Sequence, residues 1–559
     1  MRHRWPVWIG GLVWIGGLVL TSPWGCTLTG TVGLVDESTE GSGGSGDEVG
    51  LQSGGPLPDI GNGDSLVCIA RGETVQDPEC SPQTLAASFE PTLQWSWTGP
   101  DGDTDSLVIP LVANLTDDDG NGRIDLCDTP DVVVVAGPPP PTMLAQGVPP
   151  ARLFALSGAT GTPHWSSEQR IRATVTPALG DIDDDGEVEI VALAPRSTPD
   201  VAPYPSVLIA FEADGRVAWT GDEAFDATSA DAVALADLDL DGDVEIMVAD
   251  HVFDHRGQPL FSVPQARGLS DTGTRLDAPL MPFGVDLDGD DDLEVLWARG
   301  AYHHDGTEHY FNEQLPHGYA QVADLDRDGA PEIVLSTEDG IGILTAAGTP
   351  RMEIVRFEMI ARGLTNWHRP AAIHDIDGDR APDLLISAGE LLLALRPEPG
   401  VSGSSLMWRA SVADQTGAAG GTAFDFLGDG TAEAIYANED RLYAFDEVGQ
   451  ILMDTARSSI TLQEYPVVAD VDDDGSAEML VVGNIGRSGQ SLPTLMVLGE
   501  QTGRWVQARR IWNQHTYHVT NVAEDGRIPS PEPAHWLRTN TFRTNAQLED
   551  GVVCIPPVP

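Results

Sequence analysis

The chain repeats a short acidic motif whose residues could coordinate a metal ion. In its clearest copy, Asp181, Asp183 and Asp185 stand at positions 1, 3 and 5, Gly186 at position 6 and Glu189 at position 9. Carboxylates at alternate positions of a tight loop can converge on one point, the glycine allows a sharp turn, and positions 7 and 9 complete the ligand set. Such hard oxygen donors favour calcium over magnesium, because magnesium demands stricter octahedral geometry.

Eight copies of this motif, counting one early variant, are spread along the chain. Their first residues are separated by 64, 56, 49, 38, 51, 50 and 45 residues. A single copy could be a solvated acidic turn, but chance does not explain this series, and the sequence predicts about seven or eight calcium sites. The candidate ligands are Asp117, Asp119, Asn121, Arg123, Asp125 and Asp128; Asp181, Asp183, Asp185, Glu187 and Glu189; Asp237, Asp239, Asp241, Asp243 and Glu245; Asp286, Asp288, Asp290, Asp292 and Glu294; Asp324, Asp326, Asp328, Ala330 and Glu332; Asp375, Asp377, Asp379, Ala381 and Asp383; Asp425, Asp429 and Glu433; and Asp470, Asp472, Asp474, Ser476 and Glu478.

Three copies depart from the pattern. Leu427 stands at position 3 of the seventh copy and removes a ligand, so we expect this site to be the weakest. Asp291 and Arg380 replace the turn glycine at position 6, and we expect them to weaken their loops.

The segments on either side of the motifs predict short β-strands. Residues 232–236 and 246–249 flank the third copy as apolar runs without the helical period of 3.6, which disfavours helix-loop-helix calcium modules. A further strand pair follows each motif, at 153 to 165, 208 to 219, 252 to 261, 301 to 311, 341 to 354, 391 to 408, 442 to 452 and 495 to 505. Four antiparallel strands at a period near 50 residues predict an all-β propeller with eight four-stranded blades, seven blades being the alternative.

The acidic loops resemble FG-GAP (VCBS-type) repeats, the family that includes the calcium-bearing blades of the integrin α-subunit propeller. The resemblance covers residues 105–510. It implies that each acidic loop joins two strands within a blade and that calcium rigidifies one face of the propeller. The integrin propeller has seven blades and this chain has eight units, so residues 117–128 are the candidate for an irregular unit.

The N-terminal region predicts export. Basic residues 1–4 precede an apolar run at 5–20, which has the length of a signal-peptide core, and residues 1–26 are predicted to be the signal segment. Gly25-Cys26 resembles the cleavage point of bacterial lipoproteins, which would attach a lipid to Cys26; ordinary cleavage and a soluble secreted product are the alternative. We therefore expect a bacterial envelope or surface protein, or a secreted one. Residues 27–64, rich in Gly, Ser and acidic residues, are predicted to be a flexible linker.

The remaining boundaries are 65–104 for a lead-in segment, 105–510 for the propeller and 511–559 for a tail that packs on the propeller or closes it. Lipidation of Cys26 leaves four cysteines, which allow three pairings. We expect Cys68 to pair with Cys80, and Cys127 with Cys554, so that the second bond latches the ring.

A few conspicuous residues outside the motifs are expected to be structural. His515 and His518 have metal-like spacing but no nearby paired ligand in the sequence, so buried structural histidines are favoured. We expect the 303–305 cluster of two histidines and an aspartate to be a solvated turn, and Trp95 and Trp97 to be strand core. Residues 509–521 resemble a tail that follows bacterial FG-GAP propellers.

Charge and missing motifs narrow the function. The 30 basic residues, all of them arginine, oppose 87 acidic ones and give a net charge of -57, which excludes nucleic acid as a partner. The sequence contains no HExxH, GxSxG or phosphate-loop motif. It carries no evidence on oligomerisation.

The first hypothesis for the function is a calcium-stabilised, non-catalytic propeller that binds a protein or glycan in adhesion, with contacts from the insertions at 138–150 and 195–205. The second is a carbohydrate-active enzyme of polysaccharide-lyase type, because some lyases use calcium-bearing eight-bladed propellers. A lyase needs a base and charge-neutralising cations around a central cleft. Arginine and histidine are available, among them Arg369 and His368, but the sequence shows no such constellation.

Overall fold

The computed structural model describes residues 78–81, 88–100, 102–140, 147–196, 205–228, 230–266, 280–337, 340–355, 369–397, 404–414, 419–484, 492–549 and 551–556. All of them belong to one compact unit, Asp64–Pro559. The expected signal segment and linker, Cys68, His368 and parts of both insertions lie outside the described residues. Within the described part of the chain, no helix is long and apolar enough to cross a membrane.

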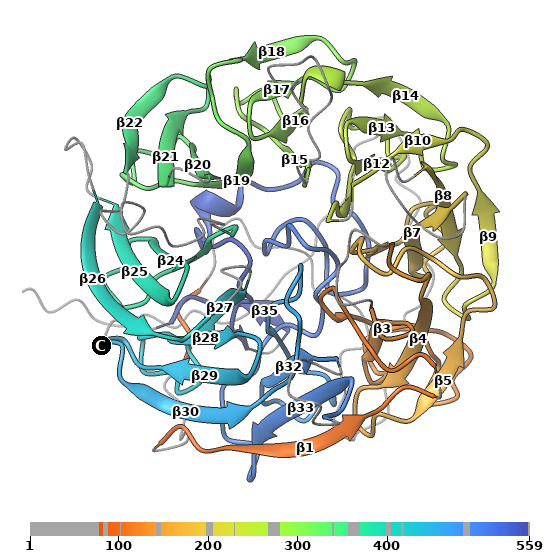
Figure 1. Ribbon diagram of the computed structural model, residues 1–559, viewed down its shortest axis with the longest axis vertical. Coiled ribbons are helices and arrows are strands. Elements are labelled where there is room, and N and C mark those ends of the chain that lie inside the picture. The colour runs from red at the N-terminus through yellow and green to blue at the C-terminus, as the bar shows by residue number, and fades with distance from the viewer. Residues whose placement is uncertain are drawn as a thin grey trace, which may run out of the picture. The chain divides into compact units, whose positions relative to one another are not determined.

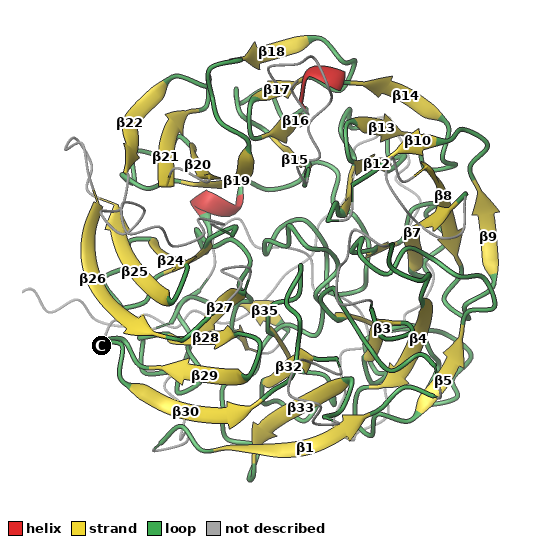
Figure 2. Ribbon diagram, in the orientation of Figure 1, coloured by secondary structure: helices red, strands yellow, loops and turns green. Residues whose placement is uncertain are grey.

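The unit is an all-β propeller with eight four-stranded blades, as predicted (Figures 1 and 2). Neighbouring strands within each blade are antiparallel. In order from the first to the fourth strand, blade 1 is β2 (Leu111–Ala113), β3 (Asp131–Ala136), β4 (Arg152–Ser157) and β5 (Pro163–Ser166); blade 2 is β6 (Ala178–Gly180), β7 (Glu189–Pro195), β8 (Pro205–Phe211) and β9 (Val217–Thr220); blade 3 is β11 (Val233–Ala236), β12 (Glu245–Val248), β13 (His251–Phe253) and β14 (Pro259–Ser262); blade 4 is β15 (Phe283–Val285), β16 (Glu294–Trp297), β17 (Gly300–Tyr302) and β18 (Glu308–Phe311).

The second half of the ring repeats this arrangement. Blade 5 is β19 (Gly318–Ala323), β20 (Glu332–Thr337), β21 (Gly340–Thr345) and β22 (Pro350–Val355); blade 6 is β23 (Ala372–His374), β24 (Asp383–Ala388), β25 (Leu391–Pro397) and β26 (Ser404–Ser411); blade 7 is β27 (Gly420–Phe424), β28 (Glu433–Ala437), β29 (Arg441–Phe445) and β30 (Ile451–Ala456); blade 8 is β31 (Val467–Ala469), β32 (Glu478–Val482), β33 (Leu495–Glu500) and β1 (Pro91–Trp97). The remaining elements are β10 (Phe225–Asp226), which pairs with β8, the pair β34 (Leu548–Glu549) and β35 (Val552–Val553), and the 3-10 turns η2 (Pro264–Ala266) and η4 (His535–Leu537).

Burial follows the position of a strand in its blade. The second strand of blade 2, β7, is buried over its first six residues, which are apolar after Glu189, because neighbouring blades cover both of its faces. The fourth strand, β9, lies on the rim and is mostly exposed, with only Trp219 half-buried. Trp219 packs on the backbone of Gly257 in the next blade, where φ is 73° and a Cβ would come within 2.4 Å of the indole. Aromatic residues of the rim therefore connect successive blades.

Strand β1 closes the ring. It pairs antiparallel with β33, the third strand of blade 8, although the two strands come from opposite ends of the propeller sequence (Figure 1). The expected strand pair at 495 to 505 is therefore wrong, because the N-terminal β1 supplies the fourth strand and the chain after Glu500 turns towards the centre of the ring. Trp97 is buried against Phe154 at a ring distance of 4.9 Å, which makes it core as expected.

The tail lies in the centre of the ring, where Figure 1 shows it in dark blue. It is held by hydrogen bonds to the first strands of seven blades, and the eighth, blade 4, contributes Phe283, which packs on Phe542 at 5.1 Å. The bonded pairs are Val112 with Trp512, Leu179 with Asn513, Leu235 with Gln514, Val322 with His535, Ile373 with Phe542, Thr422 with Arg543 and Val468 with Asn545. The tail thus fills the space that the first strands leave at the axis.

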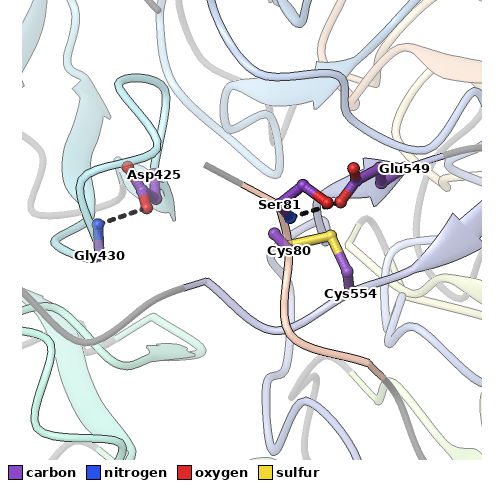
Figure 3. The surroundings of a disulfide bond; sticks show 6 residues. All are labelled: Cys80, Ser81, Asp425, Gly430, Glu549 and Cys554. Carbon is purple, nitrogen blue, oxygen red and sulfur yellow. Dashed lines mark hydrogen bonds between the residues drawn. A yellow bond between two sulfur atoms is a disulfide. The ribbon is translucent and has the colours of Figure 1, made fainter. Parts of the chain in front are cut away.

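A disulfide joins Cys80 to Cys554, so both expected pairs, Cys68 with Cys80 and Cys127 with Cys554, are wrong. The reason is local pairing: Cys80 N–H donates to Ile555 O at 2.9 Å and Ile555 N–H donates to Pro78 O at 2.8 Å, which places the two sulfurs side by side. Cys127 is itself disulfide-bonded. Figure 3 shows the Cys80–Cys554 bond beside Ser81, whose N–H donates to Glu549 Oε2 at 2.6 Å.

Candidate metal sites

Each acidic motif lies between the first and second strands of a blade. In blade 2, Asp181 follows β6 and Glu189 begins β7. The position 9 carboxylate accepts the N–H of position 2, as from Ile182 to Glu189 Oε2 at 2.9 Å, and this bond fixes one oxygen and leaves the other for a ligand. The same bond occurs from Leu238 to Glu245, Leu287 to Glu294, Leu325 to Glu332, Ile376 to Asp383, Phe426 to Glu433 and Val471 to Glu478. We call the carboxylates of positions 1, 3, 5 and 9 of one blade its cage.

Position 6 has a positive φ whether or not it is glycine. Positions 4 and 6 both have positive φ, 59° at Asp184 and 88° at Gly186 in blade 2. Asp291 and Arg380, which replace the turn glycine in blades 4 and 6, adopt φ of 76° and 65°. Their side chains cost some strain at these positions, but both residues keep the positive φ that the turn glycine has in the other blades.

Blades 2 and 3 have cages that contain only oxygen. Ligand atoms of Asp181, Asp183 and Glu189 lie within 4.8 Å of one another, and the blade 3 set of Asp237, Asp239 and Glu245 is equally close. Asp181 Oδ1 and Glu189 Oε1 are buried and have no hydrogen-bond partner among the described residues. Burial, reinforced by the neighbouring aspartates, raises the pKa of Glu189 and of Glu245 to about 8. A bound cation would neutralise these buried carboxylates and offset the cost of their burial.

Position 5 has a different role from positions 1, 3 and 9. Asp185 Oδ1 accepts the N–H of Glu187 at position 7 at 2.9 Å, and the same bond joins positions 7 and 5 in blades 3, 5, 6, 7 and 8. Position 7 therefore contacts the loop through its backbone N–H group. Its residues in the predicted ligand set are Glu187, Asp243, Ala330, Ala381 and Ser476.

Blades 5 and 6 place an arginine in the cage. Arg351, on the rim strand β22, pairs with Glu332 and lies 2.9 Å from Asp326 through Nη1. Arg396, on β25, pairs with Asp377 and lies 3.2 Å from Asp379 through Nη2. These guanidinium groups occupy the place where a cation would neutralise the carboxylates. Sequence reasoning missed both, because neither arginine belongs to the motif.

Arg351 stands at a bulge that recurs on the fourth strand of every blade. The bulge residue falls between two paired residues, as His309 does between Glu308 and Tyr310. In chain order from blade 1 to blade 8 this residue is His164, Ala218, Leu260, His309, Arg351, Met407, Leu452 and Gln94. The polar ones reach cage carboxylates: His164 Nε2 lies 3.1 Å from Asp131 Oδ1, and Gln94 Nε2 donates to Glu478 Oε1 at 3.1 Å. A sequence signal marks this position, because an aromatic residue follows it in most blades.

Blade 1 has a longer loop than the other blades. Asn114 and Asp131 occupy the places of positions 1 and 9, because Leu115 N–H donates to Asp131 Oδ2 at 3.0 Å as position 2 does to position 9 in the other blades. The ligands predicted from the sequence did not include Asp131. The expected variant at 117–128 forms an insertion with a cluster of its own, Asp117, Asp119 and Asp128. Asn121 and Arg123 bond within its turn and Asp125 N–H donates to Asp128 Oδ2.

Blades 7 and 8 complete the series. Leu427, at position 3 of blade 7, packs against a hydrophobic cluster and leaves Asp425, Asp429 and Glu433 as the cage. Burial raises the pKa of Asp425 to about 7. In blade 8, Asp470 Oδ1 and Asp472 Oδ1 are buried without hydrogen-bond partners among the described residues, and Gln507 Nε2 donates to Asp470 Oδ2 at 3.0 Å.

The two tail histidines do not lie on one site. His515 is buried against Tyr465, and burial holds its pKa well below the usual value. His518 forms a cluster with Glu532 and His535, and its Nε2 lies 2.6 Å from Glu532 Oε1. Sequence reasoning missed these partners because they come from a later segment of the tail that carries neither the repeat nor a strand.

A cavity of about 220 Å³ lies between the loops of blades 6 and 7, the tail and the C-terminal segment. Arg380, Arg538 and Cys554 line it, and the blade 7 loop at Asp425 and Gly430 appears beside the disulfide in Figure 3. Arg369 lies elsewhere, buried, with Nη1 donating to the Tyr319 hydroxyl at 3.1 Å.

Comparison with solved structures finds proteins of similar fold. The biofilm matrix protein Bap1 of V. cholerae superposes with a TM-score of 0.64 at 19% identity, over 84% of this chain and 100% of Bap1. The exotype rhamnogalacturonan lyase YesX gives 0.50 at 15% identity, over 85% of this chain and 84% of the lyase. The Bacillus licheniformis rhamnogalacturonan lyase PL11 gives 0.50 at 16%, over 85% and 83%. Neither a protein-family model nor a curated protein matches the chain. At these identities the likeness shows the fold alone.

Proposed function

We propose that the protein is an exported, calcium-stabilised propeller built from FG-GAP (VCBS-type) repeats, and that it binds a protein or glycan without catalysing a reaction. The observation that carries the calcium part is the blade 2 cage, where buried oxygens of Asp181 and Glu189 have no hydrogen-bond partner among the described residues. A buried carboxylate is costly unless a cation or donors satisfy it, so this donor set fits a bound cation.

Calcium fits the oxygen-only cages best. Calcium takes six to eight oxygen ligands in flexible geometry, and a loop that supplies two or three carboxylates and carbonyls can provide most of them. When bound, the ion would neutralise carboxylates that otherwise repel one another, and would hold the loop between the first two strands of the blade. Asp181, Asp183 and Glu189 would hold it in blade 2, and Asp237, Asp239 and Glu245 in blade 3.

The ring centre argues for binding over catalysis. A lyase needs a base and charge-neutralising cations around an open cleft. Here the tail fills the axis, with Trp512, Tyr517 and His518 buried in it. Arg369, one of the cations considered for a lyase, is buried and bonded to Tyr319. We expect contacts with a partner to come from loops of the propeller, among them the insertions at 138–150 and 195–205, which lie only partly within the described residues.

The lyase hypothesis remains the second candidate. It is favoured by the fold shared with two rhamnogalacturonan lyases over more than four fifths of the chain. The biofilm matrix protein Bap1, which superposes with a higher TM-score of 0.64, favours the binding hypothesis. Export, with a lipid on Cys26 or without one, is part of the proposal and agrees with the disulfides of the propeller, since disulfides persist in oxidising compartments.

One experiment separates the two candidates. The purified protein is incubated in calcium with acidic polysaccharides, including rhamnogalacturonan, and unsaturated products are followed by ultraviolet absorbance; the same sample is applied to protein and glycan arrays with calcium and with chelator. We expect no unsaturated product and calcium-dependent retention on the arrays. Turnover of any polysaccharide would contradict the binding proposal, and binding that is unchanged in chelator would contradict the role of calcium.

A further inference from the structure

Blade 4 has a cage with a donor set unlike those of blades 2 and 3. Ligand atoms of Asp288, Glu294, His303 and His309 all lie within 4.8 Å of one another. Asp288 and Glu294 are positions 3 and 9 of the motif, and the two histidines come from the hairpin of β17 and β18. Asp286, at position 1, is not in this set; its Oδ1 accepts the N–H of Gly289 at 2.6 Å. Two imidazoles thus stand where blades 2 and 3 have a third carboxylate.

The four side chains approach from two directions. Glu294 is fully buried, and the N–H of Leu287 holds its Oε2 at 2.8 Å, so its Oε1 faces His303 Nδ1 at 2.8 Å. His309 Nδ1 lies 3.8 Å from Asp288 Oδ2. The two imidazole rings are 5.3 Å apart and cross at 77°, so both can direct a nitrogen at one point between them without stacking.

The position of His309 explains why blade 4 differs. His309 is the bulge residue of its rim strand, and in blade 5 the same position carries Arg351, which reaches the cage as a cation. In blades 2 and 3 the position carries Ala218 and Leu260, which offer the cage no polar atom. In blades 4 and 5 the bulge residue therefore supplies a polar group to the cage carboxylates, and in blade 4 this group is an imidazole.

We propose that blade 4 holds a divalent transition metal of the zinc class, bound by Asp288, Glu294, His303 and His309, where blades 2 and 3 take calcium. Calcium prefers sites made entirely of oxygen, whereas imidazole suits zinc, copper, iron and nickel. Histidine nitrogen and carboxylate oxygen are both zinc ligands, and four protein ligands would complete a tetrahedral site. Two carboxylates balance the charge of the ion when both histidines are neutral. The metal would fasten the β17–β18 hairpin to the acidic loop of its own blade.

The test uses the full chain after chelation and dialysis, titrated with zinc alone by calorimetry and with cobalt(II) followed by absorbance. We expect wild type to bind zinc, and cobalt(II) to give the visible spectrum of a four-coordinate site. His303→Ala and His309→Ala should each lower zinc affinity at least about tenfold and remove the cobalt spectrum, because each deletes one of four ligands. Millimolar calcium should not displace the zinc.

The matched control is His304→Ala. His304 is the neighbour of His303, and its Nδ1 lies 3.2 Å from Asp292, outside the proposed set, so its loss should leave zinc affinity unchanged. The tail cluster with His518 is intact in all these variants, so any zinc that it binds cancels in the comparison. Circular dichroism checks that each variant folds. The proposal is overturned if His303→Ala and His309→Ala bind zinc like wild type, or if calcium displaces the zinc. It is also overturned if wild type binds neither zinc nor cobalt(II), in which case the histidines only pair with the carboxylates. The zinc and cobalt(II) titrations contain no calcium, which is added only in the displacement step, so failure of this site and failure of the calcium proposal are distinguishable.

Discussion

The cages of blades 2 and 5 have the same backbone and different neutralising groups. The position 2 N–H donates to the position 9 glutamate at 2.9 Å in both, from Ile182 to Glu189 and from Leu325 to Glu332. In blade 5, Arg351 lies between Glu332 and Asp326, whereas in blade 2 the bulge residue is Ala218 and no described arginine or histidine pairs with Glu189. Burial raises the pKa of Glu332 to about 7, against about 8 for Glu189, and Arg351 is among the groups that hold it down.

The acidic motif therefore determines the conformation of the loop but not the group that neutralises its carboxylates. Buried carboxylates need a counter-charge, and the chain meets that need with its own guanidinium groups in blades 5 and 6. Carboxylates without an ion pair to a described arginine or histidine remain in blades 2, 3 and 8 and in the 117–128 insertion of blade 1, and also in blade 7, which lacks the position 3 carboxylate. We therefore expect about four calcium ions per chain rather than the seven or eight that the motif count predicts.

The largest effect should follow removal of calcium. Extracellular calcium modules bind at about 10⁻⁴ to 10⁻³ M, so at about 1 mM calcium each of about four sites adds about 0.4–1.4 kcal/mol and the set adds about 2–6 kcal/mol. Chelation should lower the melting temperature accordingly, as calorimetry would show. A melting curve that is the same in chelator would contradict the calcium proposal. A measured stoichiometry near eight calcium ions per chain would mean that the arginines in blades 5 and 6 do not exclude calcium from their cages.

A pH dependence of the metal-free protein should come next. Glu189 and Glu245 have pKa values of about 8 in the fold, raised by burial from 4.5. Between these values the folded state holds protons that the unfolded state has lost, so stability in chelator should fall as the pH rises from about 5 to about 8. In calcium the fall should be weaker or reversed, because the ion binds the deprotonated carboxylates. Melting temperatures measured at several pH values, with and without calcium, test both trends. The same pH dependence in calcium and in chelator would contradict calcium binding by the cages of blades 2 and 3.

The period of the motif was enough to predict the blades, because each acidic loop is local and its flanks alternate strand and turn within a single repeat. The strand that closes the ring was not predicted, since the pairing of β1 with β33 joins residues at opposite ends of the propeller. A signal was nevertheless present: Gln94-Trp95 repeats the pairs His164-Trp165 and Ala218-Trp219 of other rim strands. The disulfide between Cys80 and Cys554 depends on the same long-range approach of the two ends.

The ligand set was predictable only within the motif. Positions 1, 3 and 9 converge in blades 2 and 3 because one short loop carries them. The groups that fill or change a cage, such as Arg351, Arg396 and His309, come from the third and fourth strands, beyond the end of the motif, and their approach depends on how the sheet bulges and pairs. Neither spacing nor charge within the motif indicates them.

Conversion of blade 5 into an open cage should have a smaller effect. Arg351→Ala leaves Glu332, which is buried, without its cation, and we expect a loss of about 1–3 kcal/mol in chelator, below the cost for a fully buried pair because Arg351 is 40% exposed. Calcium should restore part of the loss, since the cage then resembles that of blade 2. Thermal melts of the variant with and without calcium test this. The control is Arg216→Ala, which removes an exposed pair with Asp214 and should change little; an equal loss in both variants would mean that the cage carboxylates do not depend on Arg351.

The smallest effect should come from matched glutamine substitutions at position 9 of blades 2 and 5. In chelator we expect the change in stability to have opposite signs in the two blades. Glu189→Gln keeps an oxygen for the N–H of Ile182 but removes one charge, so in calcium it should cost about 0.4–1.4 kcal/mol, the contribution of one site. In chelator it should stabilise the protein, because a desolvated carboxylate beside other carboxylates is gone. Glu332→Gln should destabilise under both conditions, since it deprives Arg351 of a partner that calcium does not replace. Melting temperatures of the two variants in calcium and in chelator are sufficient. If both variants respond to calcium alike, Arg351 does not exclude the ion from blade 5, and the bulge residue does not decide the occupant of the cage.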